Sequence, residues 1–83
     1  MIESHIQAVL RHIGEDPERE GLVKTPARVA KALAEVTTGY AQNAHDILRS
    51  AIFNASDSQG LVLVRDIPFY SLCEHHLLPF FGK

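Results

Sequence analysis

Residues 69–83 read Phe69-Tyr-Ser-Leu-Cys73-Glu-His-His76-Leu-Leu-Pro79-Phe-Phe-Gly82-Lys83, and this stretch carries both the fold and the chemistry of the chain. The run from Leu77 to Phe81 is apolar and typical of a β-strand. Pro79 interrupts it, and because proline cannot donate a ladder hydrogen bond, we expect this strand at a sheet edge or a bulge. An earlier apolar run, Leu61-Val-Leu-Val64, follows Gly60 and predicts a further strand.

The sequence upstream predicts helices. Apolar residues recur at helical spacing over residues 2–13, so we expect an amphipathic helix that stops at Gly14. A charged, turn-rich connection over residues 15–24 follows it. A second helix should then start with Thr25 as N-cap and Pro26 at the first helical position, where a missing N–H costs nothing. The expected buried stripe of this helix is Val29, Leu33, Val36 and Tyr40.

A third, shorter helix is predicted after Asn43, whose side chain can cap it, with Asp46 placed favourably in its first turn. The residues expected to face inward from it are Ile47, Leu48 and Ala51. The predicted fold class is therefore α+β, with helices over residues 1–56 and the start of a sheet over residues 57–83. An unpaired apolar strand invites association, so we expect one incomplete domain, either a fragment or a subunit that other chains complete.

Composition excludes several classes of function. The 83 residues carry a formal net charge of −2, so no basic excess suggests a nucleic-acid partner. No apolar run approaches the ~20 residues of a membrane span, and the start lacks the pattern of a signal peptide. The single cysteine fits a reducing compartment. We therefore expect a cytoplasmic protein that binds neither nucleic acid nor membrane.

Cys73, Glu74, His75 and His76 place a thiol, a carboxylate and two imidazoles in one short stretch. Cys73 and His76 stand three apart, a spacing that lets a thiolate and an imidazole converge on one Zn²⁺. The plain alternative is that the lone cysteine is a small buried hydrophobe. His75 is a poor further ligand, because neighbours on an extended chain point to opposite faces.

A catalytic zinc site normally has about three protein ligands, and only two are visible in this sequence. Three explanations stay open at this point. A residue beyond Lys83 completes the site, another chain supplies the third ligand, or no tight site exists.

Arg28 and Lys31 lie one turn apart near the start of the second predicted helix. The helix dipole disfavours cations there, and together with the free N–H groups of the helix start they would suit a polyanion such as a triphosphate. A solvated helix face is the alternative, since Lys and Arg are common on helix surfaces.

Three motifs, in order, resemble the amino-terminal part of the GTP cyclohydrolase I family. They are Gly14-Glu-Asp-Pro17-Glu-Arg-Glu-Gly21-Leu-Val-Lys-Thr25-Pro26-Ala-Arg28-Val-Ala-Lys31, then Arg65-Asp66-Ile67, then residues 69–83 quoted above. The resemblance covers nearly the whole chain but only the first part of the family's catalytic domain. It implies an antiparallel tunnelling-fold sheet, of which this chain holds the first strands.

The resemblance also implies roles for individual residues. Cys73 and His76 would bind Zn²⁺, and His75 would transfer protons. Arg28 and Lys31 would approach the phosphates of GTP. Glu74 would be one of the substrate-binding residues, and it would orient His75 or hold the loop. The family's third zinc ligand is a cysteine far downstream that has no counterpart here.

The implied reaction opens the imidazole ring of GTP, releases formate and yields 7,8-dihydroneopterin triphosphate, the first step of tetrahydrofolate and pterin biosynthesis. The family forms ring-shaped homodecamers with sites at subunit junctions, so a homo-oligomer is expected. Because the third ligand is missing, this chain alone is expected to release no formate from GTP. One alternative is a non-catalytic truncated paralogue or assembly subunit of that family. Others are a small structural zinc module and a related tunnelling-fold enzyme acting on pterins or deazaguanines.

Overall fold

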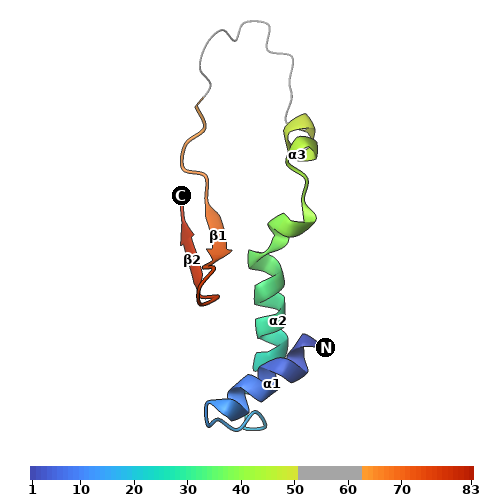
Figure 1. Cartoon of the computed structure of the whole chain (residues 1–83), viewed down its shortest axis with the longest axis vertical. Coiled ribbons are helices and arrows are strands. Elements are labelled where there is room, and N and C mark those ends of the chain that lie inside the picture. The colour runs from blue at the N-terminus through green and yellow to red at the C-terminus, as the bar shows by residue number, and fades with distance from the viewer. Residues whose placement is uncertain (51–62) are drawn as a thin grey trace, which may run out of the picture. The chain divides into compact units, whose positions relative to one another are not determined.

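The computed structural model describes residues 1–50 and 63–83. Its elements are α1 (Ile2–His12), α2 (Thr25–Val36), the 3₁₀ helix η1 (Thr38–Ala41), α3 (Ala44–Ser50), β1 (Phe69–Leu72) and β2 (Pro79–Gly82) (Figure 1). Helices followed by an antiparallel strand pair confirm the α+β class. The described residues form two compact units, Met1–Glu35 and Val36–Lys83. The expected domain division at residues 56 and 57 stays a prediction, because it lies outside the described residues.

Helix α1 ends at His12, in agreement with the predicted stop at Gly14. This residue has φ +95°, a left-handed conformation that glycine adopts without steric cost. It allows the Glu15 N–H to donate to Leu10 O at 2.9 Å and the Gly14 N–H to donate to Arg11 O at 3.1 Å. These two bonds form a Schellman motif, which satisfies carbonyls at the helix end. Leu10 itself is buried, and its side chain is the core hydrophobe among the described residues.

The predicted turn-rich connection is present between α1 and α2. Asp16 Oδ1 accepts a hydrogen bond from the Glu18 N–H at 2.9 Å, and the Arg19 guanidinium donates to Glu15 Oε2 at 2.9 Å. Arg19, by hydrogen bonding first and by its charge second, holds the pKa of the Glu15 carboxyl below its usual value. Both side chains are exposed, so this ion pair contributes little to the free energy of folding.

The start of α2 lies one residue earlier than predicted. The Arg28 N–H donates to Lys24 O at 3.1 Å, so Lys24 holds the N-cap position and Thr25 is already helical. Pro26 then occupies the second helical position, where it is also buried and where its missing N–H again leaves no bond unmade.

The prediction that Tyr40 belongs to the buried stripe of α2 is wrong. Val29, Leu33 and Val36 are half-buried as expected, but α2 ends at Val36. The chain then tightens into η1, whose three residues per turn rotate Tyr40 away from the stripe, and Tyr40 is 96% exposed.

Helix α3 confirms the predicted cap. Asn43 Oδ1 accepts hydrogen bonds from the N–H groups of His45 at 2.9 Å and Asp46 at 3.2 Å. The inward-facing prediction is wrong for Ile47 and Leu48, which are 50% and 65% exposed. Ala51 lies outside the described residues.

Strands β1 and β2 form an antiparallel hairpin in which Leu72 pairs with Pro79 and Phe69 with Gly82. Pro79 is the first residue of β2, which has one neighbouring strand within residues 1–50 and 63–83, so the edge prediction is confirmed for the described sheet. The expected strand at Leu61-Val-Leu-Val64 is not found where it can be seen. Leu63 and Val64 are not part of a strand, since the sheet of the described residues consists of β1 and β2. Leu61 and Val62 lie outside the described residues.

Each face of the hairpin carries an aromatic pair. The rings of Phe69 and Phe80 meet edge to face with centroids 6.2 Å apart, and on the opposite face Tyr70 and Phe81 stack at 6.2 Å. Such pairs contribute about 0.5–1.5 kcal/mol beyond the area they bury. The Phe69 ring also covers Gly82, where a Cβ atom would lie 2.7 Å from Phe69 Cζ. Aromatic packing therefore fixes the register on both faces.

We predict that Gly82→Ala displaces the Phe69 ring, because the new methyl group would occupy its position. Ring-to-ring nuclear Overhauser effects between Phe69 and Phe80 should weaken, while those between Tyr70 and Phe81 persist. Gly39→Ala is the matched control, since nothing lies within 4 Å of a Cβ atom built there. Unchanged Phe69–Phe80 contacts in Gly82→Ala would contradict this packing.

Candidate metal and substrate site

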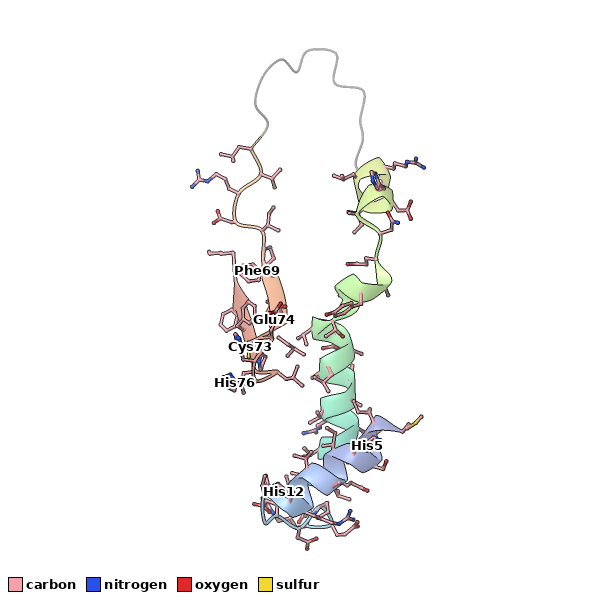
Figure 2. The ribbon with its side chains drawn as sticks, in the orientation of Figure 1. His5, His12, Phe69, Cys73, Glu74 and His76 are labelled. Carbon is pink, nitrogen blue, oxygen red and sulfur yellow. The ribbon has the colours of Figure 1, made fainter. Side chains whose placement is uncertain are left out.

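Residues 73–78, here named the cysteine loop, connect β1 to β2 and carry the predicted metal and proton-transfer residues. Figure 2 shows Cys73, Glu74 and His76 at the turn end of the hairpin, with Phe69 at the opposite end of β1. The structure therefore brings Cys73, Glu74, His75 and His76 together in one loop. Arg28 and Lys31 lie on α2, in the other compact unit.

The sulfur of Cys73 is the acceptor at the centre of the cysteine loop. The backbone N–H groups of His76 and Leu78 both donate to Cys73 Sγ, each at 3.3 Å. Hydrogen bonds to a charged acceptor favour the charged form. The N–H of Leu78 first, and that of His76 second, accordingly lower the pKa of the Cys73 thiol from its usual value. Cys73 is half-buried and unpaired in a disulfide, so the buried-hydrophobe alternative does not describe it.

The main chain of the cysteine loop explains how two N–H groups reach one sulfur. The Cys73 N–H donates to Leu78 O at 2.9 Å, which continues the pairing of β1 with β2 by one residue. The Leu78 N–H, however, goes to the sulfur, while Cys73 O accepts from the Leu77 N–H at 3.1 Å. Leu77 has φ +56°, the left-handed region, and this turns the chain between the two donors. The sulfur thus replaces a carbonyl oxygen in the ladder.

The histidines sit side by side on the exposed part of the cysteine loop. The ring centroids of His75 and His76 are 6.1 Å apart, with planes tilted by 52°. Both side chains, and that of Glu74, are exposed. One imidazole can therefore act as a ligand while its neighbour stays open to solvent and exchanges protons.

The donor set of this loop suits zinc. Thiolate and imidazole are ligands that Zn²⁺ prefers, whereas Mg²⁺ and Ca²⁺ require oxygen ligands. Two N–H groups that favour deprotonation of the sulfur prepare it for a metal, because metal binding needs the deprotonated form. Within residues 1–50 and 63–83, no three His, Cys, Asp or Glu side chains form a group that could hold a metal. The loop therefore fits part of a zinc site.

Arg28 and Lys31 are exposed on α2. The salt bridges of the described residues are Met1 with Glu3 and Glu15 with Arg19, so no carboxylate there neutralises Arg28 or Lys31. Two cations one helical turn apart near the start of a helix are available to an anion. The same exposure is compatible with a solvated face, so their phosphate role stays a prediction.

The sequence predicted side chains for the site, and these stay predictions, but it did not indicate the backbone groups around the sulfur. The N–H groups of His76 and Leu78 are what surround the sulfur, and any residue except proline can supply an N–H. The left-handed Leu77 was also missed, because leucine gives no indication of that conformation.

Comparison with known proteins identifies the family. The sequence profile described as GTP cyclohydrolase I matches residues 2–83. The chain belongs to the GTP cyclohydrolase I family. The protein named GTP cyclohydrolase 1 from Campylobacter jejuni is 58% identical over 81 residues, which are 98% of this chain and 42% of that protein.

Further relatives agree. Proteins named GTP cyclohydrolase 1 from Parabacteroides distasonis and Porphyromonas gingivalis are each 55% identical over 82 residues, 99% of this chain and 42% of theirs. The chain thus spans less than half the length of these relatives. No helix within residues 1–50 and 63–83 has both the length and the apolar character needed to cross a membrane.

The pKa of Cys73 gives a testable prediction. Its lowered pKa means that the thiolate stabilises the folded loop above the unfolded thiol's pKa, and that this stabilisation is lost as pH falls through the folded value. The rate of alkylation by iodoacetamide should therefore rise with a midpoint at lower pH in the native, metal-free chain than in the chain unfolded by urea. An equal or higher native midpoint would show that the N–H groups do not reach the sulfur.

Proposed function

We propose that this chain supplies the amino-terminal part of a zinc-dependent GTP cyclohydrolase I. The enzyme would hydrolyse the imidazole ring of GTP to formate and 7,8-dihydroneopterin triphosphate, the first step of tetrahydrofolate and pterin biosynthesis. The observation that carries the proposal is the family match over residues 2–83. The arrangement of the cysteine loop, in which two N–H groups donate to the Cys73 sulfur, supports the metal part of the proposal.

Cys73 and His76 would hold the zinc ion, with further ligands from outside these residues. When bound, zinc would supply Lewis acidity that polarises an oxygen of water or substrate. His75 would accept and donate protons during ring opening, because an imidazole can serve both as a general base and as a general acid. Glu74 would orient His75 or hold the loop beside the substrate.

Arg28 and Lys31 would bind the triphosphate of GTP. Cations one helical turn apart can share a polyanion, and charge-assisted hydrogen bonds to phosphate are among the stronger ones. The assembly would be a cytoplasmic homo-oligomer, a decamer with sites at subunit junctions. The partners would then be GTP and further copies of the protein, with no nucleic acid or membrane.

A chimera tests the activity. In it, residues 1–83 replace the matched segment of the Campylobacter jejuni relative. We expect formate release and pterin fluorescence with GTP. His75→Ala should lower kcat by about 10²–10⁴-fold, the usual contribution of a general acid or base. His45→Ala, which alters an exposed histidine on α3, is the matched control and should change nothing.

The chimera also separates the catalytic proposal from the non-catalytic alternative. Size-exclusion chromatography and zinc analysis first establish that it assembles like the relative and carries metal. A chimera that assembles and holds zinc but releases no formate would favour a truncated paralogue or assembly subunit over an enzyme.

A second prediction concerns Arg28, measured in the His75→Ala chimera so that GTP is not consumed during calorimetric titration. Arg28→Ala should weaken GTP binding by roughly 1.5–3 kcal/mol, about 10- to 150-fold, and leave guanosine binding almost unchanged. Lys31→Ala should act in the same direction. Arg11→Ala on α1 is the matched control. Changes below about 0.5 kcal/mol for both ligands would assign Arg28 to a solvated face.

A further inference from the structure

Leu77 combines an exposed side chain with a backbone conformation that leucine avoids. Leu77 is 68% exposed, so burial among the described residues gives little reason for a leucine at this position. Its φ of +56° lies in the left-handed region, where a Cβ atom crowds the following carbonyl oxygen. A residue held in a sparsely populated conformation needs surroundings that enforce it, and such residues gather at functional sites.

The hydrogen bonds around Leu77 show what this conformation achieves. Leu77 stands between the two residues whose N–H groups donate to Cys73 Sγ, His76 before it and Leu78 after it. Its own N–H is bonded to Cys73 O, so it takes no part in holding the sulfur. A left-handed residue in a turn can direct the N–H groups on either side of it toward one concave site.

Pairing between β1 and β2 fixes the two ends of the cysteine loop. The Cys73 N–H donates to Leu78 O, and the next pair in the ladder is Leu72 with Pro79. The hairpin therefore anchors both ends of residues 73–78, and the direction of the Leu78 N–H depends on the backbone turn at Leu77. We infer that Leu77 is a positioning residue, whose left-handed backbone directs the N–H groups of His76 and Leu78 onto Cys73 Sγ and thereby prepares the sulfur for zinc.

This inference rests on the proposed function for its metal, while its structural part stands on the metal-free loop. Groups that hydrogen-bond to metal ligands commonly change metal affinity by about 10–100-fold when they are lost. For Leu77 that effect would arise from backbone conformation alone. Residues that tolerate φ near +56° could therefore replace Leu77 without loss of metal affinity, whereas residues that resist this conformation could not.

Three variants separate backbone conformation from side-chain packing. Leu77→Asn and Leu77→Gly introduce residues that adopt the left-handed region readily. Leu77→Val keeps an apolar side chain, but a β-branched residue is a genuine outlier there. Co²⁺ is titrated into the reduced 83-residue chain, and thiolate-to-cobalt absorption reports binding at Cys73. We expect Leu77→Asn and Leu77→Gly to bind within about threefold of wild type and Leu77→Val to bind at least about tenfold more weakly.

Hydrogen exchange of the His76 and Leu78 amides is the second measurement and needs no metal. Both amides should stay protected in Leu77→Asn and exchange at least about tenfold faster in Leu77→Val, as loss of a hydrogen bond of about 1.4 kcal/mol requires. Ring contacts between Tyr70 and Phe81 show that the hairpin remains folded. If Leu77→Val loses these contacts, the decision passes to Leu77→Asn, whose retained cobalt affinity supports the inference and whose loss overturns it.

The outcomes for the inference and for the proposed function are distinguishable. The role of Leu77 would be overturned if Leu77→Val matched wild type in cobalt binding and amide exchange while Leu77→Asn and Leu77→Gly were impaired. Such a result would show that the apolar side chain matters and the backbone conformation does not. A wild-type chain without thiolate-to-cobalt absorption would mean that two ligands alone hold cobalt too weakly, and amide exchange alone would then decide the inference. The metal role of Cys73 is decided separately, by zinc analysis of the chimera with Cys73→Ser, so the two outcomes stay distinct.

Discussion

The acceptance of two backbone N–H groups by the sulfur of Cys73 is the interaction on which the candidate site depends. Unpaired backbone donors are costly when they are shielded from water, and a tight loop offers few acceptors for them. Here the Cys73 sulfur is that acceptor, so the two hydrogen bonds stabilise the loop and also lower the pKa of the thiol. The Cys73 sulfur, which organises the backbone of the loop, is also the atom that would bind a metal ion.

The hairpin matters because it brings the ends of this loop together. Aromatic pairs on both faces, Phe69 with Phe80 and Tyr70 with Phe81, set the register of β1 against β2. A register slip by one residue would move every side chain to the other face and separate Cys73 from Leu78. Packing several residues away from the sulfur therefore controls the position of the donors beside it.

Local chemistry made much of the fold predictable from sequence. Gly14 ends α1 and Asn43 caps α3, because each meets a requirement of the backbone that few other residues meet. Tyr40 was mispredicted because helical periodicity does not reveal where an α-helix tightens into a 3₁₀ turn. For the site, the sequence indicated Cys73 and His76 through their spacing. It could not indicate Leu77, whose conformation comes from closure of the hairpin and not from leucine itself.

Membership of the GTP cyclohydrolase I family gives this loop its proposed purpose, and the central claim is that Cys73 and His76 bind the metal while His75 does not. Nuclear magnetic resonance of the chimera loaded with ¹¹³Cd in place of zinc tests this most directly, since scalar coupling passes only through metal–ligand bonds. The account predicts coupling from cadmium to the Cys73 β-protons and to the ring protons of His76, with none to His75. Coupling to His75 in place of His76, or no coupling to Cys73 in cadmium-loaded protein, would contradict it.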